Sequence, residues 1–483
     1  IKPGGRGRLF GNLTQLSGFA PPLDIGLLAG FLREQGFSVR IIDADAEFLT
    51  PRETAQKAVE YDPLLAGIFA HTMRMGHASQ TVKEIRSLSP RIAVLLGGRH
   101  PSALPAKTLT EEQPDFVVEG EAYLALARLL PLLRSRGREK DYDIKNLWYR
   151  GPGGEVRSNP RAPLVNLDEL PLIAWDLLPM DKYRAHNWQC FGSSFRQPYA
   201  ILYTSIGCPF DCNYCCVNTV YGKPGIRFRS PEKVLEELDY LVANYKVRYI
   251  RITDDNFTFN PERVNRICDL IIARGYSLNM WCYSRVDTVT EGMLKKMKQA
   301  GIEWICYGIE AGRQGVREGV SKKINSSTIE RAVAMTRQAG IHIIANFIFG
   351  LPDDTRATMQ ETLDMAKRFN FEYVNLYAAM AWPGSQLYEQ SVRAGIPLPG
   401  TWDGYSPLSE DTLPLPTKYL APSEVLKFRD RAFEEYFGNP AYQAMIVEKF
   451  GAEAAQSVQE MLKNKIKRRY ADQAAPGVSN EKK

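Results

Sequence analysis

Two series of short apolar segments run through most of this 483-residue chain, and a helical pattern separates each segment from the next. An apolar run of about four to eight residues between helices predicts a strand that is buried on both faces of a parallel sheet. The chain is also longer than one hydrophobic core usually organises. The sequence therefore predicts two α/β domains, each built on a mostly parallel sheet.

The first series spans residues 1–137 and predicts a doubly wound, Rossmann-like domain. Ligands bind such sheets at the carboxyl ends of the strands. The opening residues, Ile1 to Gly5, resemble a loop after a strand, so we expect an initial strand to be missing from this sequence. The predicted strands are Val39 to Ile42, Leu65 to Phe69, Ile92 to Leu96 and Phe116 to Val118, with helices at Leu23 to Gln35 and Gln80 to Leu88.

The second series lies in residues 196–390, after a stretch at 138–195 that is rich in Pro, Gly and Asp and that we interpret as a linker. Helix starts at Ser230-Pro231-Glu232 and Asn260-Pro261-Glu262 each carry a cap, a first-turn proline and an acidic residue. The alternation predicts a partial (β/α)6 barrel. Its six strands are expected at Ala200 to Ser205, Tyr249 to Thr253, Leu278 to Tyr283, Trp304 to Ile309, His342 to Phe349 and Tyr373 to Ala378.

Residues 391–483 predict a Pro-rich loop and then a helical segment from Ser423 to Tyr470, and we expect the last dozen residues to be disordered. The formal net charge is only +6, and the one basic run, Lys463 to Arg469, falls late in the helical pattern. Nucleic acid is therefore not an expected partner. No stretch is apolar enough for a membrane span or a signal peptide, which predicts a cytoplasmic protein.

Three cysteines follow the first strand of the second series in one loop, as Cys208-x3-Cys212-x2-Cys215. Three thiolates can hold three irons of a four-iron cluster, and the fourth iron then keeps an open coordination position. The alternative is a zinc site in which Cys216 or a distant residue is the fourth ligand. Cys216 is a poor candidate because it is adjacent to Cys215. The cysteines outside the loop that fall in predicted strands or helices, Cys268, Cys282 and Cys306, are interpreted as small buried hydrophobes.

This loop, with Tyr214 just before the third cysteine, resembles the signature of the radical S-adenosylmethionine (SAM) superfamily. The resemblance implies a 4Fe-4S cluster held by Cys208, Cys212 and Cys215, with SAM chelating the open iron and giving a 5'-deoxyadenosyl radical. The Asp254-Asp255 pair resembles the cobalamin-dependent branch. The residues that the resemblance implies for SAM binding are Phe210, Tyr214, Asp254, Asp255, Ser284, Arg285, Glu310, Gly350, Leu351 and Pro352.

The first domain resembles the corrinoid-binding domain that precedes many radical SAM barrels, through Pro21 to Ala29, Gly97 to Ser102 and Glu119 to Glu121. The Asp-x-His-x-x-Gly segment that places a histidine on cobalt in many cobalamin proteins is absent. The resemblance therefore implies base-off cobalamin, with the cobalt facing residues such as Thr72 or Met73. The implied cobalamin-binding residues are His71, Thr72, Met73, Gly97, Gly98, His100, Glu119, Gly120 and Glu121.

The resemblance implies a C-methyltransferase that acts on an unactivated carbon of a small-molecule or lipid substrate, through a 5'-deoxyadenosyl radical and methylcobalamin. A reductant such as flavodoxin or ferredoxin is the expected partner. A cobalamin-dependent cyclase or rearrangement enzyme is the main alternative, and a non-catalytic metal or electron-transfer protein is a further one. A methylthiotransferase acting on RNA needs three more cysteines in the leading domain, which has none before Cys190.

The sequence does not identify the substrate or a catalytic acid or base. Aromatic residues that are candidates for the substrate pocket are equally good core residues. The segment from Trp402 to Tyr419 either closes over the barrel as a lid or anchors the final helices. The aromatic candidates are Trp281, Tyr307, Tyr377 and Trp382.

Overall fold

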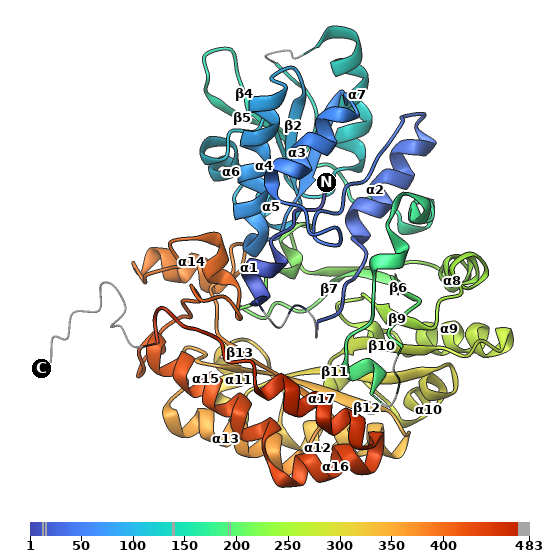
Figure 1. Ribbon diagram of the computed structural model, residues 1–483, viewed down its shortest axis with the longest axis vertical. Helices are drawn as coiled ribbons and strands as arrows, with labels where there is room; N and C mark the ends of the chain where they lie inside the picture. The colour runs from blue at the N-terminus through green and yellow to red at the C-terminus, as the bar shows by residue number, and fades with distance from the viewer. Residues whose placement is uncertain (12–13, 15–16, 138–140, 192, 194, 472–483) are drawn as a thin grey trace, which may run out of the picture.

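A computed structural model describes residues 1–11, 14, 17–137, 141–191, 193 and 195–471 of the chain. Figure 1 shows a first domain, drawn in blue, that sits above a second domain drawn in green to orange. The last helices, drawn in red, lie along the outside of the second domain. None of the helices in the described part of the chain combines the length and the apolar character that a membrane crossing requires. The expected disorder of the last residues concerns 472–483, which lie outside the described part.

The first domain is a doubly wound sheet, as predicted, because both faces of its central strand are buried under helices. Alternate residues of β2 (Ala93–Gly97) belong to two separate apolar clusters, one shared with α2 (Leu23–Glu34) and α7 (Tyr123–Arg136) and the other with α3 (Pro51–Glu60) and α4 (Met75–Leu88). The strand order is β1-β2-β3-β4-β5. The other strands are β1 (Leu65–Phe69), β3 (Phe116–Val118), β4 (Leu147–Arg150) and β5 (Val156–Ser158).

The predicted strand from Val39 to Ile42 is wrong, because this segment has too little backbone beside it to form a ladder. Its only strand-like pairing is a single parallel bridge between Lys2 and Asp43. The opening residues supply the partner: Lys2 N donates to Ile42 O at 2.9 Å, and on the other side Phe69 N donates to Ile1 O at 3.1 Å. Ile1 and Lys2 thus lie between this segment and β1.

The stretch interpreted as a linker contributes two strands that the sequence did not reveal. β4 pairs antiparallel with β3, and β5 pairs antiparallel with β4, so this hairpin extends the first sheet. Both strands are short, and β5 is mostly exposed, which leaves almost no apolar periodicity to detect. In the described part of the rest of this stretch the chain forms short helical turns and one antiparallel bridge, between Arg184 and Phe19.

The second domain is a partial barrel of six parallel strands, as predicted, in the order β13-β12-β11-β10-β9-β6. Adjacent strands are parallel, and the two end strands, β13 and β6, are not neighbours in the sheet. The predicted helix caps are confirmed, since Asn260 Oδ1 accepts from Arg263 N at 3.1 Å and Ser230 Oγ accepts from Lys233 N at 3.4 Å. The strands are β6 (Tyr199–Leu202), β9 (Tyr249–Ile252), β10 (Asn279–Ser284), β11 (Ile302–Glu310), β12 (His342–Phe349) and β13 (Tyr373–Ala378).

Helices on the outside of the barrel separate these strands in sequence. They are α8 (Pro231–Tyr245), α9 (Pro261–Arg274), α10 (Glu291–Gln299), α12 (Ser326–Gln338) and α13 (Arg356–Phe369). The chain leaves β6 at Leu202, earlier than predicted, and Ser205 instead begins a two-stranded hairpin of β7 (Ser205–Cys208) and β8 (Gly225–Phe228). This hairpin carries the cysteine loop.

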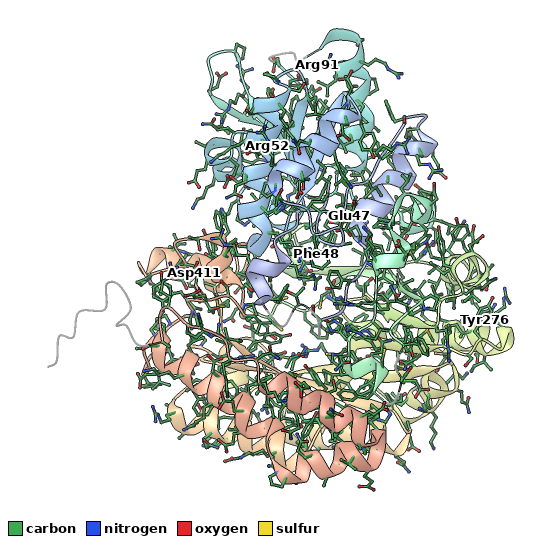
Figure 2. The ribbon with its side chains drawn as sticks, viewed as in Figure 1. Glu47, Phe48, Arg52, Arg91, Tyr276 and Asp411 are labelled. Carbon is green, nitrogen blue, oxygen red and sulfur yellow. The ribbon has the colours of Figure 1, made fainter. Side chains whose placement is uncertain are left out.

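The C-terminal helices are α15 (Pro422–Phe437), α16 (Pro440–Phe450) and α17 (Ala452–Leu462). The prediction that the basic run lies within a helix is wrong, because α17 ends at Leu462, before the run begins. The chain then turns back so that its cations reach carboxylates: Arg468 contacts Asp430 at 2.9 Å, and Arg469 contacts Asp411, labelled in Figure 2, at 3.0 Å. These ion pairs, rather than a helix dipole, balance the run.

A buried ion pair ties the 138–195 stretch to the barrel and gives a stability prediction. Glu237 on α8 is fully buried, lies 2.9 Å from Arg229 and accepts a hydrogen bond from Trp175 Nε1 at 2.6 Å. Glu237→Gln keeps the shape but leaves the buried charge of Arg229 uncompensated, so we expect the free energy of unfolding to fall by about 3 kcal/mol. The measurement is equilibrium unfolding in urea.

The matched control is Glu232→Gln on the same helix. Glu232 pairs with Arg266 at 2.9 Å where both side chains are exposed. Exposed pairs contribute about 1 kcal/mol or less. Equal urea midpoints for the two variants would show that the buried pair has no special role.

Candidate active site

The cysteine loop begins where β7 ends, at Cys208, and Cys212 and Cys215 follow in the turn toward β8. Cys215 N donates to Cys212 O at 3.0 Å, which closes a tight turn between the second and third thiols. All three cysteines are free thiols, and none of the three is fully buried. Burial raises the pKa of the Cys208 thiol, and burial together with Cys216 raises that of Cys215 to about 12. Binding to iron replaces these protons.

The donor set fits a four-iron cluster better than a zinc ion. In a four-iron cluster each thiolate binds a different iron, so the ligands surround the cluster and do not converge on one point. A structural zinc site needs four convergent ligands. Within the part of the chain that the structure describes, no three His, Cys, Asp or Glu side chains converge in that way.

Asp254 fixes the start of the cysteine hairpin. Its buried carboxylate accepts hydrogen bonds from Thr204 N at 2.7 Å, Thr204 Oγ1 at 2.5 Å and Ser205 Oγ at 2.6 Å. Burial raises the pKa of Asp254, while these hydrogen bonds act in the opposite direction. Three of its acceptor positions are thus already filled by protein. The next residue, Asp255, lines the cavity instead, and the contact of either carboxylate with SAM stays a prediction.

Arg285 lies between the cysteine loop and an acidic partner. Its guanidinium makes two hydrogen bonds to Asp287, at 3.0 and 2.8 Å, and a third nitrogen lies 3.9 Å from Cys212 Sγ. The same group sits 3.7 Å from the centre of the Phe210 ring. The predicted SAM residues Phe210 and Arg285 are thus in contact, and a positive charge lies beside the cluster ligands. The Ser284 hydroxyl is bonded to Thr258 Oγ1.

Glu310 ends β11 in a strained conformation and pairs with Lys322. Its φ is +70°, a region that non-glycine residues rarely adopt. Glu310 Oε1 lies 2.6 Å from Lys322 Nζ, and both side chains are nearly buried. Glu310 also contacts the Tyr214 hydroxyl, whose pKa is raised well above its usual value, chiefly by burial. Strained backbone of this kind is concentrated at functional sites, so the end of β11 is a candidate functional position.

The predicted turn Gly350-Leu351-Pro352 follows β12. Asp354 accepts hydrogen bonds from Gly350 N at 3.0 Å and Leu351 N at 3.1 Å. Gly350 has a φ of +81°, and a Cβ there would lie 2.4 Å from Val425 on α15. The sequence of this turn is therefore set by its backbone shape and by the helix that covers it.

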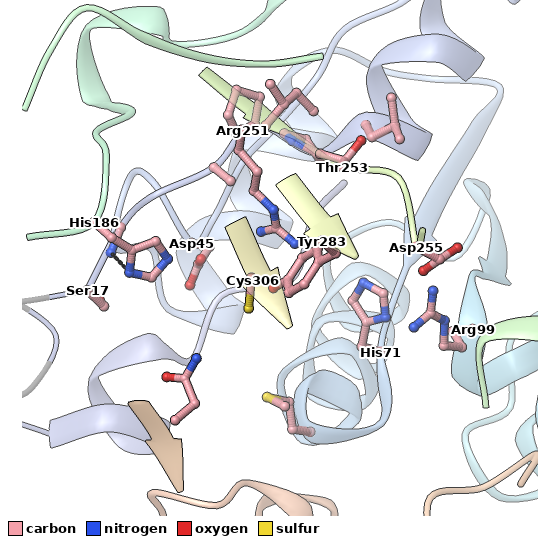
Figure 3. A pocket seen from close by; sticks show the side chains of 18 of the residues that line it. Ser17, Asp45, His71, Arg99, His186, Arg251, Thr253, Asp255, Tyr283 and Cys306 are labelled. Atoms are coloured by element: carbon pink, nitrogen blue, oxygen red, sulfur yellow. Dashed lines mark hydrogen bonds between the residues drawn. The ribbon is translucent and has the colours of Figure 1, made fainter. Parts of the chain in front are cut away.

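One cavity of about 770 Å³ lies between the two domains and extends into the barrel. Figure 3 shows it from close by, with residues from both domains around it. Its volume is within the range of about 300–1,000 Å³ typical of ligand sites. Of the residues predicted to bind a cofactor, it is lined by His71, Met73, Gly98, Gly120, Glu121 and Asp255.

The first-domain wall of this cavity contains two glycines whose places the packing of the backbone requires. Gly98 and Gly120 have φ values of +96° and +92°, and a Cβ would lie 2.9 Å from Ala70 N or 3.0 Å from Val220 O. Only glycine fits these positions. Because both glycines line the cavity, backbone without a side chain faces a ligand there, as a corrinoid bound against this domain would require. His71 reaches into the cavity, and its pKa is lowered to about 3, first by burial and then by nearby arginines.

Four of the predicted cobalamin residues lie behind this wall rather than on it: Thr72, Gly97, His100 and Glu119 are not among the residues that line the cavity. His100 Nδ1 and Thr72 Oγ1 are 3.1 Å apart in a shared hydrogen bond, so Thr72 does not face the cavity as expected. Gly97 packs against Phe69, where a Cβ would be 2.6 Å from the ring. These residues support the wall from behind, and their predicted contact with cobalamin stays a prediction.

The segment Glu119-Gly120-Glu121 holds the cysteine hairpin. Glu119 pairs with Arg161 at 2.6 Å, and Arg161 Nη2 donates to Thr219 O at 3.2 Å just beyond the cysteines. Glu121 forms an ion pair with Arg227 on β8. The residues that follow β3 therefore hold the hairpin whose loop carries the three cysteines.

Arg99 is a cavity residue that the sequence analysis did not select. It faces Asp255 across the opening between the domains (Figure 3). Burial raises the pKa of Asp255, and Arg99 counteracts this. Burial also opposes the charge of Arg99, but its acidic neighbours, Cys216 and Asp255 first among them, raise its pKa. Its place directly after the Gly97-Gly98 pair was the available signal.

The barrel lumen forms the inner part of the cavity, and most of its side chains were not predicted. They alternate along the strands with residues that face the outer helices, so the signal was the period of two along each strand. Of the predicted aromatic candidates, Trp281 and Tyr377 line the cavity. Tyr307 is fully buried and shares a hydrogen bond with Thr336 at 2.7 Å. The lumen residues that were missed include Tyr199, Arg251, Tyr283, Cys306 and Asn375.

The segment from Trp402 onward contacts the first domain. The Trp402 ring lies 4.4 Å from His100, and its indole N–H donates to Glu112 at 3.3 Å. Asp403 contacts Arg8 at 2.5 Å. This segment therefore joins the C-terminal region to the first domain.

The same segment also contacts the chain after α17. Arg469 pairs with Asp411 at 3.0 Å, and Arg468 donates to Thr412 Oγ1 at 2.8 Å. These contacts support the interpretation that the segment anchors the final helices.

The cysteine assignment gives a direct test. After anaerobic reconstitution we expect the protein to bind about four irons per chain. Cys212→Ala removes one thiolate and should lose most of the iron and its visible absorbance. Iron content and the visible spectrum are the measurements.

Cys216→Ala is the matched control, because it removes the neighbouring thiol that the zinc interpretation uses. It should retain the iron. Loss of iron in this variant and retention in Cys212→Ala would contradict the assignment.

Comparisons with known proteins agree with this geometry. Residues 202–366 match the radical SAM superfamily, and residues 11–130 match the B12 binding domain. Over 422 residues the chain is 33% identical to an uncharacterized methyltransferase of Pyrococcus horikoshii, covering 87% of this chain and 88% of that one. Over 384 residues it is 27% identical to the anaerobic magnesium-protoporphyrin IX monomethyl ester cyclase of Rubrivivax gelatinosus, covering 78% and 67%.

Among solved structures, the radical SAM methyltransferase TsrM of Kitasatospora setae, with cobalamin and a 4Fe-4S cluster bound, has the same fold. Its TM-score is 0.67 at 16% sequence identity, and the match covers 92% of this chain and 97% of that one. The two domain matches, the 33% identity to a methyltransferase and the shared fold give one conclusion. The chain belongs to the cobalamin-dependent radical SAM methyltransferase family, and it is a radical SAM enzyme whose cofactors are a 4Fe-4S cluster, SAM and cobalamin.

Proposed function

We propose that this enzyme transfers a methyl group to an unactivated carbon of a small-molecule or lipid substrate. The observation that carries the proposal is that one cavity is lined by residues of both domains. Gly98 and Gly120, here called the glycine wall, come from the B12-binding domain, and Ile206 and Tyr221 come from the hairpin that carries the cysteine loop. A substrate in the lumen below would then be within reach of both cofactor sites. When bound, the cluster and SAM supply a radical, and the corrinoid carries the methyl group.

The residues of the chain have positioning roles in this proposal. Cys208, Cys212 and Cys215 hold the cluster, and Asp255 with Arg99 lies at the junction of the two domains. Gly98 and Gly120 let the corrinoid approach the backbone closely. The barrel and the domain above it exclude water, which protects a reactive radical from side reactions. No side chain is assigned as an acid or base.

The substrate class and the reductant are parts of the proposal. The lumen has an apolar, largely aromatic wall, which supports a substrate with an apolar body. Reductive cleavage of SAM consumes an electron, so a one-electron donor such as flavodoxin or ferredoxin is the proposed partner.

Cyclisation without methyl transfer is the second candidate, favoured by the 27% identity to a cyclase. Both reactions use the same cavity and the same cofactors. They differ in the fate of the SAM methyl group, so the two proposals are separable by isotope labelling.

For a methyltransferase we expect label from the methyl group of SAM to appear on the bound cobalamin and then in the product, because SAM must give up that methyl group. The anaerobically reconstituted enzyme is incubated with methyl-labelled SAM and a reductant, and cobalamin and small molecules are analysed by mass spectrometry. Cys212→Ala serves as the control and should form no 5'-deoxyadenosine. Formation of 5'-deoxyadenosine with no labelled cobalamin or product favours the cyclase.

A further inference from the structure

The lumen contains one cation that has no acidic partner. Arg251 comes from the middle of β9 and extends into the cavity beside Tyr283 and Cys306 (Figure 3). Its Nε is buried and has no hydrogen-bond partner among the described residues. Nor does any described carboxylate lie within ion-pairing distance of the guanidinium. Burial acts to lower the pKa of Arg251, and Asp255, at the rim of the cavity, raises it less than Tyr283, Tyr199 and Cys306 do.

The other cations that line the cavity, apart from Arg99, each have a carboxylate within ion-pairing distance. Arg429 contacts Asp430 at 2.8 Å and donates to Leu376 O at 2.7 Å. Arg6 and Arg74 both contact Asp45, at 2.9 and 2.7 Å. Lys2 contacts Asp43 at 3.2 Å. Arg99 also has a buried Nε without a hydrogen-bond partner among the described residues, but it lies beside Asp255 at the junction of the domains. Arg251 is therefore the cation of the lumen that the described carboxylates leave unpaired.

A second donor lies next to Arg251. Trp281 on β10 is the register partner of Arg251 on β9, and its indole Nε1 is also buried with no partner among the described residues. The guanidinium carbon lies 5.1 Å from the centre of the Trp281 ring and 5.3 Å from that of Tyr283. These ring faces offset part of the desolvation of the cation. They supply no negative charge.

An arginine fork and an adjacent N–H match a carboxylate in shape and charge. Burying a cation without a counter-charge is costly, so an arrangement like this one is explained when a ligand brings the counter-charge. A single unpaired cation balances a single negative charge, which favours a carboxylate over a doubly charged phosphate. The surrounding wall, including Trp188, Ile344 and Tyr373, is apolar or aromatic.

We propose that the substrate is an apolar monocarboxylate, whose carboxylate binds Arg251 and the Trp281 N–H and whose apolar body lies against the aromatic wall of the lumen. The inference rests on the proposed function, since it takes the lumen as the substrate site. It differs from SAM recognition, because Arg285, not Arg251, lies beside the cluster ligand Cys212.

The test measures the charge preference of the lumen in the reconstituted holoenzyme with SAM present. The probes are phenylbutyrate and its neutral counterpart phenylbutanol, titrated by calorimetry. Hydrogen bonds to charged groups predict that the wild-type enzyme binds the carboxylate at least about tenfold more tightly than the alcohol. Arg251→Gln should abolish this preference, while its affinity for the alcohol stays within about twofold.

Two further variants separate binding from folding. Arg251→Lys keeps the charge but loses the planar fork, so it should retain part of the preference. Arg266→Gln removes an exposed arginine of α9 that pairs with Glu232, and it should behave like the wild-type enzyme. Iron and cobalamin contents are measured for each variant to confirm that the holoenzyme is intact.

Several outcomes would overturn the inference. The first is that the wild-type enzyme does not bind phenylbutyrate, or binds it no more tightly than phenylbutanol. The second is that Arg251→Gln loses affinity for both probes to the same extent. The third is that this variant loses a similar factor in its affinity for SAM. The labelling experiment is independent of these outcomes. A charge preference without methyl transfer would refute the proposed reaction alone, and methyl transfer without a charge preference would refute the monocarboxylate alone.

Discussion

The site depends on the ion pairs and hydrogen bonds between the end of β3 in the first domain and the cysteine hairpin. Glu119, through Arg161, and Glu121, through Arg227, hold the hairpin from the end of β3. Gly120 lies between them, with no room for a Cβ beside Val220 O. These contacts place the cluster ligands against the glycine wall that fits the corrinoid. They are the contacts that join the end of β3 directly to the hairpin that carries the cysteines.

The hairpin is held from the barrel side by Asp254. Its carboxylate binds both Thr204 and Ser205, so the chain leaves the barrel sheet at a fixed point and turns into β7. The same constraint orients Asp255 toward the cavity, since neighbouring residues at a strand end point in different directions. The carboxylate of Asp254 thus binds Thr204 and Ser205, whereas the carboxylate of Asp255 faces the cavity. Their adjacent positions in sequence hide this difference in role.

The sequence predicted the fold well where a segment is buried on both faces, because such strands are apolar throughout and unmistakable. Strands β2, β3 and β6 are of this kind. It failed where pairing depends on distant backbone: Val39 to Ile42 has only Ile1 and Lys2 beside it, and β4 and β5 are too short to show a pattern. The site followed the same rule. The cysteine spacing is local and therefore visible, whereas the roles of Glu119 and His100 depend on partners that are far away in sequence, Arg161 and Trp402.

Charges are balanced differently in the two parts of the cavity, the junction of the domains and the barrel lumen. At the junction of the domains Arg99 faces Asp255, so the protein balances its own charges where polar cofactors must bind and leave. Deeper in the lumen the balance is incomplete, because Arg251 is surrounded by rings that attract a cation without neutralising it. A protein that needed Arg251 only for stability would gain by pairing it or replacing it with an apolar residue. An open charge at the end of an apolar pocket is instead what orients a ligand that has one charged end, and such orientation decides which carbon lies toward the cofactors.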